Sequence, residues 1–100
     1  MVPFAGYDMP VQYPLGIMGE PNHCRARAGL FDVSHTGQAR YVGDEAALEA
    51  LITADLSALS AGEQKYTLLL NDKGGIRDDL MASRPAGEGL FLVVNAATKN

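Results

Sequence analysis

The chain has 100 residues, of which 47% are hydrophobic and 20% are charged, a balance that suits one globular domain or part of a larger one. Its formal net charge is −4, and its eight lysine and arginine residues are scattered. Nucleic-acid surfaces and polybasic membrane anchors need clustered basic residues, so both kinds of partner are disfavoured. The single cysteine, Cys24, excludes a disulfide within the chain, and no apolar run reaches the roughly 18 residues of a membrane-spanning helix.

The first part of the chain predicts extended segments around one helix. Residues 1–15 hold three prolines among apolar residues, which favours extended chain or an edge strand because proline removes a donor from a ladder. Residues 20–28 are expected to form a helix, with Pro21 in its first turn. Residues 30–43 then favour one strand, or two strands with a kink at Gly37.

The second part begins with the clearest helical pattern, over residues 44–55. Asp44 is a good N-cap, and leucine and isoleucine recur behind it at helical spacing. Three segments of β-forming residues follow, at 65–71, 76–83 and 90–95. The glycine pair in residues 72–75 predicts a hairpin turn between the first two, since a phosphate-loop pattern is absent there. The last segment is apolar on both faces, which is typical of a central strand covered on both sides.

This order of elements predicts an α+β fold, with a mostly antiparallel sheet and helices packed on one face. Residues 95–100 read as the start of a helix that stops before it reaches a stable length. The chain also starts as an apolar segment, whereas a natural terminus is more often polar. We therefore expect residues 1–100 to be a partial N-terminal domain, truncated at both ends.

The stretch "FDVSH", residues 31–35, brings aspartate, serine and histidine close together in sequence. Alternate residues of a strand face opposite sides, so Ser34 and His35 would not meet, and a local catalytic triad is disfavoured. A turn held by side-chain hydrogen bonds and a lining role at a ligand pocket both stay open. His23, Cys24 and His35 do not match the ligand spacing of a zinc site, so no metal is expected.

A pair of adjacent aspartates, Asp78 and Asp79, falls inside a predicted strand. Aspartate is a poor strand former, and two neighbouring carboxylates resist burial together. Because adjacent strand residues point to opposite faces, the two side chains need not share a site. The residues alone leave two interpretations open. Either both carboxylates are solvated and discourage edge pairing, or one lines a cavity and handles a proton near neutral pH.

Five stretches stand out together: "MVPFAGYDMPVQY", "RARAGLFDVSH", "ITADLSAL", "NDKGGIRDDL" and "LFLVVNAAT". In this order and at this spacing they resemble the N-terminal part of the aminomethyltransferases, the T-proteins of the glycine cleavage system. The resemblance covers essentially the whole chain. It implies a three-domain fold around a central folate cavity, with this stretch in the first domain. It also implies transfer of the methylene group from aminomethyl-dihydrolipoyl H-protein to tetrahydrofolate, with release of ammonia.

The resemblance further implies site residues. By motif, Asp79 falls on the family's catalytic acid, which contacts the folate amine that attacks the methylene carbon. Its implied role is to take up the released proton or to stabilise the developing cation. Asp78 stays open as the alternative catalytic carboxylate. Tyr66, Val93 and Asn95 match positions that line the folate cavity.

The chain departs from the family at Tyr7 and Thr36, where members often have tryptophan and methionine. Further folate contacts of the family lie beyond residue 100, so we expect this piece to be inactive by itself. Two rival hypotheses are a folate-binding relative without this reaction, such as a demethylation module or an iron–sulfur maintenance protein, and a small domain with solvated hairpin carboxylates. The resemblance implies a cytoplasmic location for a bacterial protein and the mitochondrial matrix for a eukaryotic one.

Overall fold

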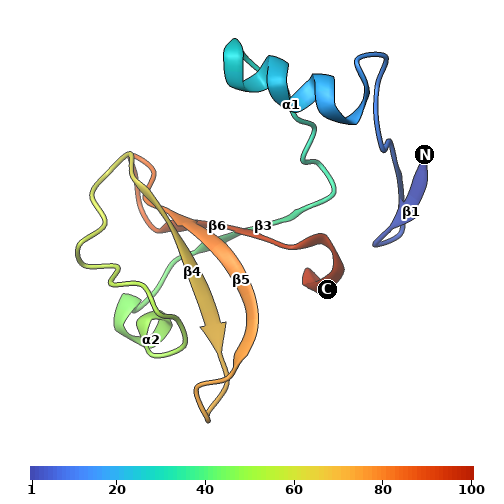
Figure 1. The fold of residues 1–100 in the computed structure, drawn as a ribbon. Coiled ribbons are helices and arrows are strands. Elements are labelled where there is room, and N and C mark those ends of the chain that lie inside the picture. The colour runs from blue at the N-terminus through green and yellow to red at the C-terminus, as the bar shows by residue number, and fades with distance from the viewer. The chain divides into compact units, whose positions relative to one another are not determined.

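The computed structural model describes residues 1–100, which form two compact units, residues 1–35 and residues 36–100 (Figure 1). In the first unit, strands β1 (Val2–Phe4) and β2 (Tyr7–Met9) pair antiparallel, and helix α1 spans Gly16–Ala26. No helix in either unit has both the length and the apolar character that crossing a bilayer requires.

Two predictions for the first unit need correction. Helix α1 begins earlier than predicted, at Gly16, so Pro21 lies inside the helix and not in its first turn. The strand predicted from residue 30 onward is absent before Gly37. The reason is a local turn, in which Asp32 accepts hydrogen bonds from the main-chain N–H of Ser34, at 2.9 Å, and from its hydroxyl. Such side-chain bonds compete with a strand ladder, and they confirm the turn interpretation of "FDVSH".

The second unit is built on a four-stranded antiparallel sheet with the strand order β3-β6-β5-β4. The strands span Gly37–Tyr41 (β3), Gln64–Leu70 (β4), Ile76–Ser83 (β5) and Leu90–Val94 (β6). The three later strands match their predicted ranges within a residue, and the α+β class is confirmed. β6 is central, as predicted. Its Phe91 is 37% exposed, however, so the prediction that both faces of this strand are covered is wrong at Phe91.

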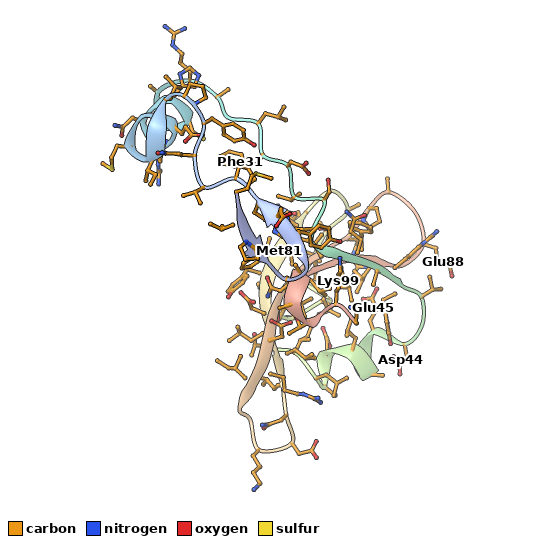
Figure 2. All side chains as sticks on the ribbon, turned by 90° about the vertical axis from the view of Figure 1, so that its right-hand side faces the viewer. Phe31, Asp44, Glu45, Met81, Glu88 and Lys99 are labelled. Atoms are coloured by element: carbon orange, nitrogen blue, oxygen red, sulfur yellow. The ribbon has the colours of Figure 1, made fainter.

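Helix α2 spans only Glu45–Glu49, so the predicted helix over residues 44–55 is too long. The predicted cap is confirmed, because the Asp44 carboxylate accepts the N–H of Ala46 at 3.0 Å (both Asp44 and Glu45 are labelled in Figure 2). Beyond Glu49 the main chain makes one more hydrogen-bonded turn, in which the N–H groups of Ala50 and Leu51 donate to the carbonyls of Ala46 and Leu48. The chain then pairs with the edge of β4, where Ile52 forms a single bridge with Leu69.

The burial pattern of the segment after α2 explains why the helical pattern was misleading. Ile52, Ala54 and Leu56 are buried at alternate positions, which is the period of a strand and not of a helix. Ile52 and Leu56 stand four residues apart, so they fit both periods over this short stretch, and the hydrogen bonds to β4 decide between them. Thr53 supplies two of these bonds: its main-chain N–H donates to the Leu68 carbonyl at 3.2 Å, and its hydroxyl accepts the Leu68 N–H at 3.3 Å.

The core of the second unit lies between one face of the sheet and the segment that follows α2. Its buried members are Ile52, Ala54, Leu56, Leu59, Leu80, Ala82 and Leu90. Leu48 of α2 packs against this cluster. At the end of β5, the Arg84 guanidinium forms a forked ion pair with Glu45, at 2.7 and 2.8 Å, and donates to the carbonyls of Leu56 and Leu59. This single side chain therefore ties the sheet to α2 and to the segment behind it.

The turn before β6 depends on Gly89, whose φ is +85°. A Cβ at this position would lie 2.5 Å from the carbonyl oxygen of Tyr41 on the neighbouring strand β3. Both observations require a residue without a side chain, because only glycine adopts this backbone region freely and fits so close an approach.

Candidate functional site

The sheet face that points away from the core carries most of the residues singled out in the sequence. Tyr66 of β4 pairs with Met81 of β5, and Met81 pairs in turn with Val93 of β6. Directly opposed residues of antiparallel strands share a face, so these three side chains form a row across the sheet (Met81 is labelled in Figure 2). Asp79 pairs with Leu68 and lies on the same face, next to this row. We call this surface the outer sheet face.

The Asp79 carboxylate is held from two sides. The hydroxyl of Tyr66 donates to its Oδ2 at 2.7 Å, and the side-chain amide of Asn95 donates to its Oδ1. The same amide lies 3.2 Å from the main-chain carbonyl oxygen of Asp79. The accepting carboxylate raises the pKa of the Tyr66 phenol above its ordinary value. Three of the predicted site residues thus meet at one half-buried carboxylate.

Strand alternation assigns Asp78 to the opposite face of β5, yet its carboxylate shares the Asn95 amide with Asp79 and has two further donors. Its Oδ1 accepts the Asn95 amide and the main-chain N–H of Asp79, each at 2.9 Å, and its Oδ2 accepts the hydroxyl of Thr98. These bonds, with the Thr98 hydroxyl as the largest cause, lower the pKa of Asp78 below its ordinary value. The sheet accepts two adjacent aspartates because one amide, from Asn95, donates to both.

The local backbone supports this arrangement. The hairpin turn predicted before Ile76 is confirmed: Asn71 closes it by accepting the N–H groups of Lys73 and Gly75, at 3.0 and 2.8 Å. The register between β4 and β5 shifts just before Asp78, so Arg77 is the extra residue of a β-bulge. Bulges re-aim the side chains beside them, and this one directly precedes the two aspartates.

Sequence reasoning named neither Met81 nor Thr98 as a member of the site. Met81 stands two residues after Asp79 on a predicted strand, so the alternation of strand faces was a usable signal. Thr98 stands three residues after Asn95, within the single turn of 3-10 helix at Ala96–Thr98 that replaces the predicted helix start. Nothing in the sequence indicated that its hydroxyl would reach across to Asp78.

The other motifs do not form a comparable site. The hydroxyl of Ser34 donates to Asp32, while the His35 ring lies edge-on to Phe4 and Tyr7, with ring centroids 5.9 and 6.4 Å away. No three histidine, cysteine, aspartate or glutamate side chains gather in a metal-binding group in the structure.

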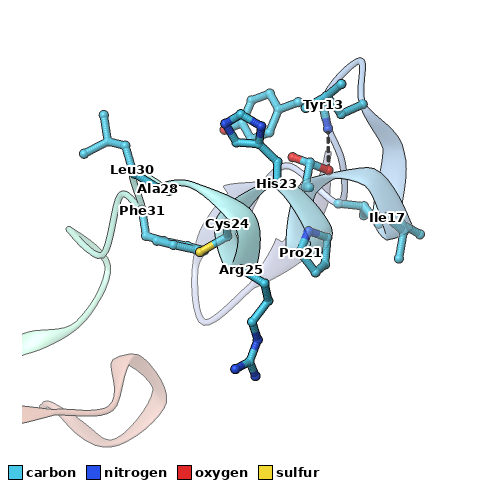
Figure 3. Close-up of a pocket in the computed structure, with 13 residues that line it drawn as sticks. Tyr13, Ile17, Pro21, His23, Cys24, Arg25, Ala28, Leu30 and Phe31 are labelled. Carbon is cyan, nitrogen blue, oxygen red and sulfur yellow. Dashed lines mark hydrogen bonds between the residues drawn. The ribbon is translucent and has the colours of Figure 1, made fainter.

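A cavity of about 650 Å³ lies within the first unit, between α1 and the segments on either side of it (Figure 3). Its lining is mainly apolar and includes Tyr13, Cys24 and Phe31. Its one carboxylate, Glu20, accepts the main-chain N–H of Tyr13 at 3.2 Å and so ties the chain to the helix. The cavity contains none of the predicted site residues, and the outer sheet face is the better candidate site.

Comparison with known proteins agrees with this fold and these motifs. The family model described as the GCVT N-terminal domain matches residues 1–100. The mitochondrial aminomethyltransferase of Dictyostelium discoideum is 51% identical over 98 residues, which cover 96% of this chain and 24% of that protein. An aminomethyltransferase of Clostridium botulinum is 42% identical over 102 residues, which cover the whole of this chain and 27% of that protein.

Among solved structures, the glycine cleavage system aminomethyltransferase T of Bartonella henselae superposes with a TM-score of 0.80 at 41% identity, over 96% of this chain and 27% of that one. The fold is therefore that of the N-terminal part of a glycine cleavage T-protein. The chain belongs to the GCVT N-terminal domain family, whose members compared here are aminomethyltransferases. It spans about a quarter of the length of these relatives.

Proposed function

We propose that this chain supplies the part of the folate site that carries the catalytic carboxylate in a tetrahydrofolate-dependent aminomethyltransferase. In the proposed reaction the methylene group passes from aminomethyl-dihydrolipoyl H-protein to tetrahydrofolate, and ammonia is released. The family and the names of the relatives support the class of reaction. The observation that carries the proposal for this chain is the Asp79 carboxylate, held between the Tyr66 hydroxyl and the Asn95 amide on the outer sheet face.

The residues of the outer sheet face fit a reduced pterin. Leu68, Met81 and Val93 are half-buried and offer apolar contact to a flat ring, and the Tyr66 ring beside them is 58% exposed. A pterin also has an edge of N–H donors, for which a carboxylate is the complementary acceptor. A mostly apolar surface with a few fixed polar groups is the usual composition of a small-molecule site. Bound tetrahydrofolate would supply the amine nitrogen that receives the one-carbon unit.

Asp79 is better suited than Asp78 to contact a reacting amine. Each Asp79 oxygen accepts one side-chain hydrogen bond, which leaves further lone pairs for an N–H of the ligand. Asp78 accepts three donors from the protein, and its lowered pKa makes it a weaker base. In this proposal Asp79 orients the amine and accepts its proton. The fixed geometry should lower the activation barrier more than the proton transfer does, because positioning can lower a barrier by roughly 7–11 kcal/mol.

The test measures tetrahydrofolate-dependent ammonia release from aminomethyl-loaded H-protein by the complete product of the gene. We expect Asp79→Asn to lower the rate by a factor on the order of 10² to 10⁴, the usual contribution of a positioned acid or base. Asp72→Asn is the matched control, since it removes an exposed carboxylate in the turn of the same hairpin, and it should leave the rate unchanged.

Each alternative has its own result. Full activity in Asp79→Asn would move the chemistry to another group, with Asp78 the first to test. A wild-type protein that binds tetrahydrofolate but releases no ammonia would be a folate-binding relative with another activity. The relatives include a mitochondrial protein and bacterial ones, so we propose the mitochondrial matrix or the cytoplasm according to the source.

A further inference from the structure

The Asn95 side chain can adopt only one useful orientation in this site. Its Nδ2 faces three acceptors: Oδ1 of Asp78, Oδ1 of Asp79 and the main-chain oxygen of Asp79. An amide nitrogen has two N–H donors, whereas the amide oxygen has none. Turning the amide over would aim its oxygen at two carboxylates and lose every one of these bonds. The two negative charges therefore determine which end of the amide faces them.

The carboxylate that holds this amide is itself held from outside the strand. The Thr98 hydroxyl donates to Oδ2 of Asp78, and the main-chain N–H of Asp79 donates to Oδ1. Thr98 belongs to the turn of 3-10 helix at Ala96–Thr98, and this turn is anchored by Ala96, which is only 7% exposed. A connected line of hydrogen bonds thus runs from Thr98 through Asp78 and Asn95 to Asp79.

We propose that Asp78 and Thr98 are positioning residues, which fix the Asn95 amide and through it the orientation of the Asp79 carboxylate. This inference rests on the proposed function and deepens it, because it gives Asp78 a role other than acid–base chemistry. Thr98 holds one oxygen of Asp78, so the other oxygen stays aimed at the amide. Without the hydroxyl, the Asp78 carboxylate is held only through its Oδ1, by the main-chain N–H of Asp79 and the Asn95 amide, so its plane can turn and the amide can shift away from Oδ1 of Asp79. Its second support, from Tyr66, is then insufficient to fix the carboxylate plane.

The matched pair Thr98→Val and Thr98→Ser tests the role of the hydroxyl. Valine has nearly the shape of threonine without the donor, while serine keeps the donor and loses a methyl group. We expect Thr98→Val to lower kcat about tenfold or more, since misplacement of a reacting group by about 1 Å can cost on the order of 10²-fold. The KM for tetrahydrofolate should change little, and Thr98→Ser should retain most of the wild-type kcat.

A second comparison separates positioning from a structural role. In an Asp79→Asn background, Thr98→Val should have no further effect on the residual rate, because the residue it positions is already disabled. A loss that is the same in both backgrounds would overturn the proposal. So would equal kcat values for Thr98→Val and Thr98→Ser.

The geometric part can be decided without turnover, by crystal structures of the wild type and of Thr98→Val. We expect the Asn95 amide to contact Asp79 in the wild type and to leave it in the variant. An Asn95 that keeps its place in Thr98→Val would overturn the positioning role whatever the activity. If the wild-type enzyme releases no ammonia, the proposed function fails, and these two structures still decide whether Thr98 holds the amide.

Discussion

Leu56 and Leu51 give the sharpest test of the segment that follows α2. A helix over residues 44–55 would place Leu51 on its apolar side, together with Leu48 and Ile52. In the structure Leu51 is 51% exposed, whereas Leu56 is 0% exposed. The substitutions Leu56→Ala and Leu51→Ala remove the same atoms from the two environments. The ratio of their effects therefore reports the local structure and not the chemistry of the side chain.

The expected magnitudes follow from burial. Leucine to alanine removes three carbon groups, worth about 2.4 kcal/mol at about 0.8 kcal/mol each. At Leu56 a cavity term adds to this, which brings the loss to about 3–5 kcal/mol. At Leu51 about half of the transfer term applies and no cavity forms, so the loss should stay near 1 kcal/mol.

Native-state hydrogen exchange, read by mass spectrometry on peptides from β4 and β5, measures the free energy of local opening in the complete protein. Leu56→Ala should lower the protection of these peptides by the larger amount. Equal losses in the two variants, or a larger loss for Leu51→Ala, would contradict the burial seen in the segment after α2 and favour a helix over residues 44–55.

Two further predictions concern the framework around the sheet. Gly89→Ala should destabilise the domain by about 1–3 kcal/mol, because φ is positive there and the new Cβ would meet the carbonyl oxygen of Tyr41. Gly87→Ala is the control, since a Cβ there meets nothing within 4 Å. Thermal unfolding should show a clear loss of stability for Gly89→Ala and little change for Gly87→Ala. Arg84 lowers the pKa of Glu45 from 4.5, so the stability gained from this ion pair is present above about pH 4.5 and is lost as the pH falls through the lowered pKa. The urea midpoints of wild type and Glu45→Gln should therefore differ at pH 7 and approach each other as the pH falls below about 4.5, and a difference that stays constant as the pH falls would contradict this assignment.

The strands of the second unit were predictable because several signals coincide in them. The segments around Tyr66, Asp79 and Val93 combine β-forming residues with a glycine turn between the first two, so their bounds follow closely from the sequence. The alternation of faces suggested that Asp78 and Asp79 need not share a site, whereas in the structure both carboxylates accept the Asn95 amide. The outer sheet face was therefore within reach of sequence reasoning.

The remaining features depend on contacts between distant parts of the chain or on local competition. The helix predicted over residues 44–55 was too long because Ile52 and Leu56 fit both the helical period and the strand period. Pairing with β4 favours the strand period. The strand predicted from residue 30 failed because the Asp32 side chain bonds to Ser34 and holds a turn. The hydrogen bond from Thr98 to Asp78 joins positions 20 residues apart, and no local sequence pattern predicts it.

The position of β6 affects how the domain forms during synthesis. Of the four strands in this sheet, β6 is synthesised after the other three, yet it lies between β3 and β5, so the sheet cannot be completed before residues 90–94 emerge. Until residues 90–94 emerge, β3 and the hairpin of β4 and β5 each present an open edge, of the kind that pairs with other chains. Asn95 follows directly, so the two aspartates gain their shared donor only when the sheet closes. A nascent chain stalled before this point would be the most prone to aggregate, and it would also lack an ordered site.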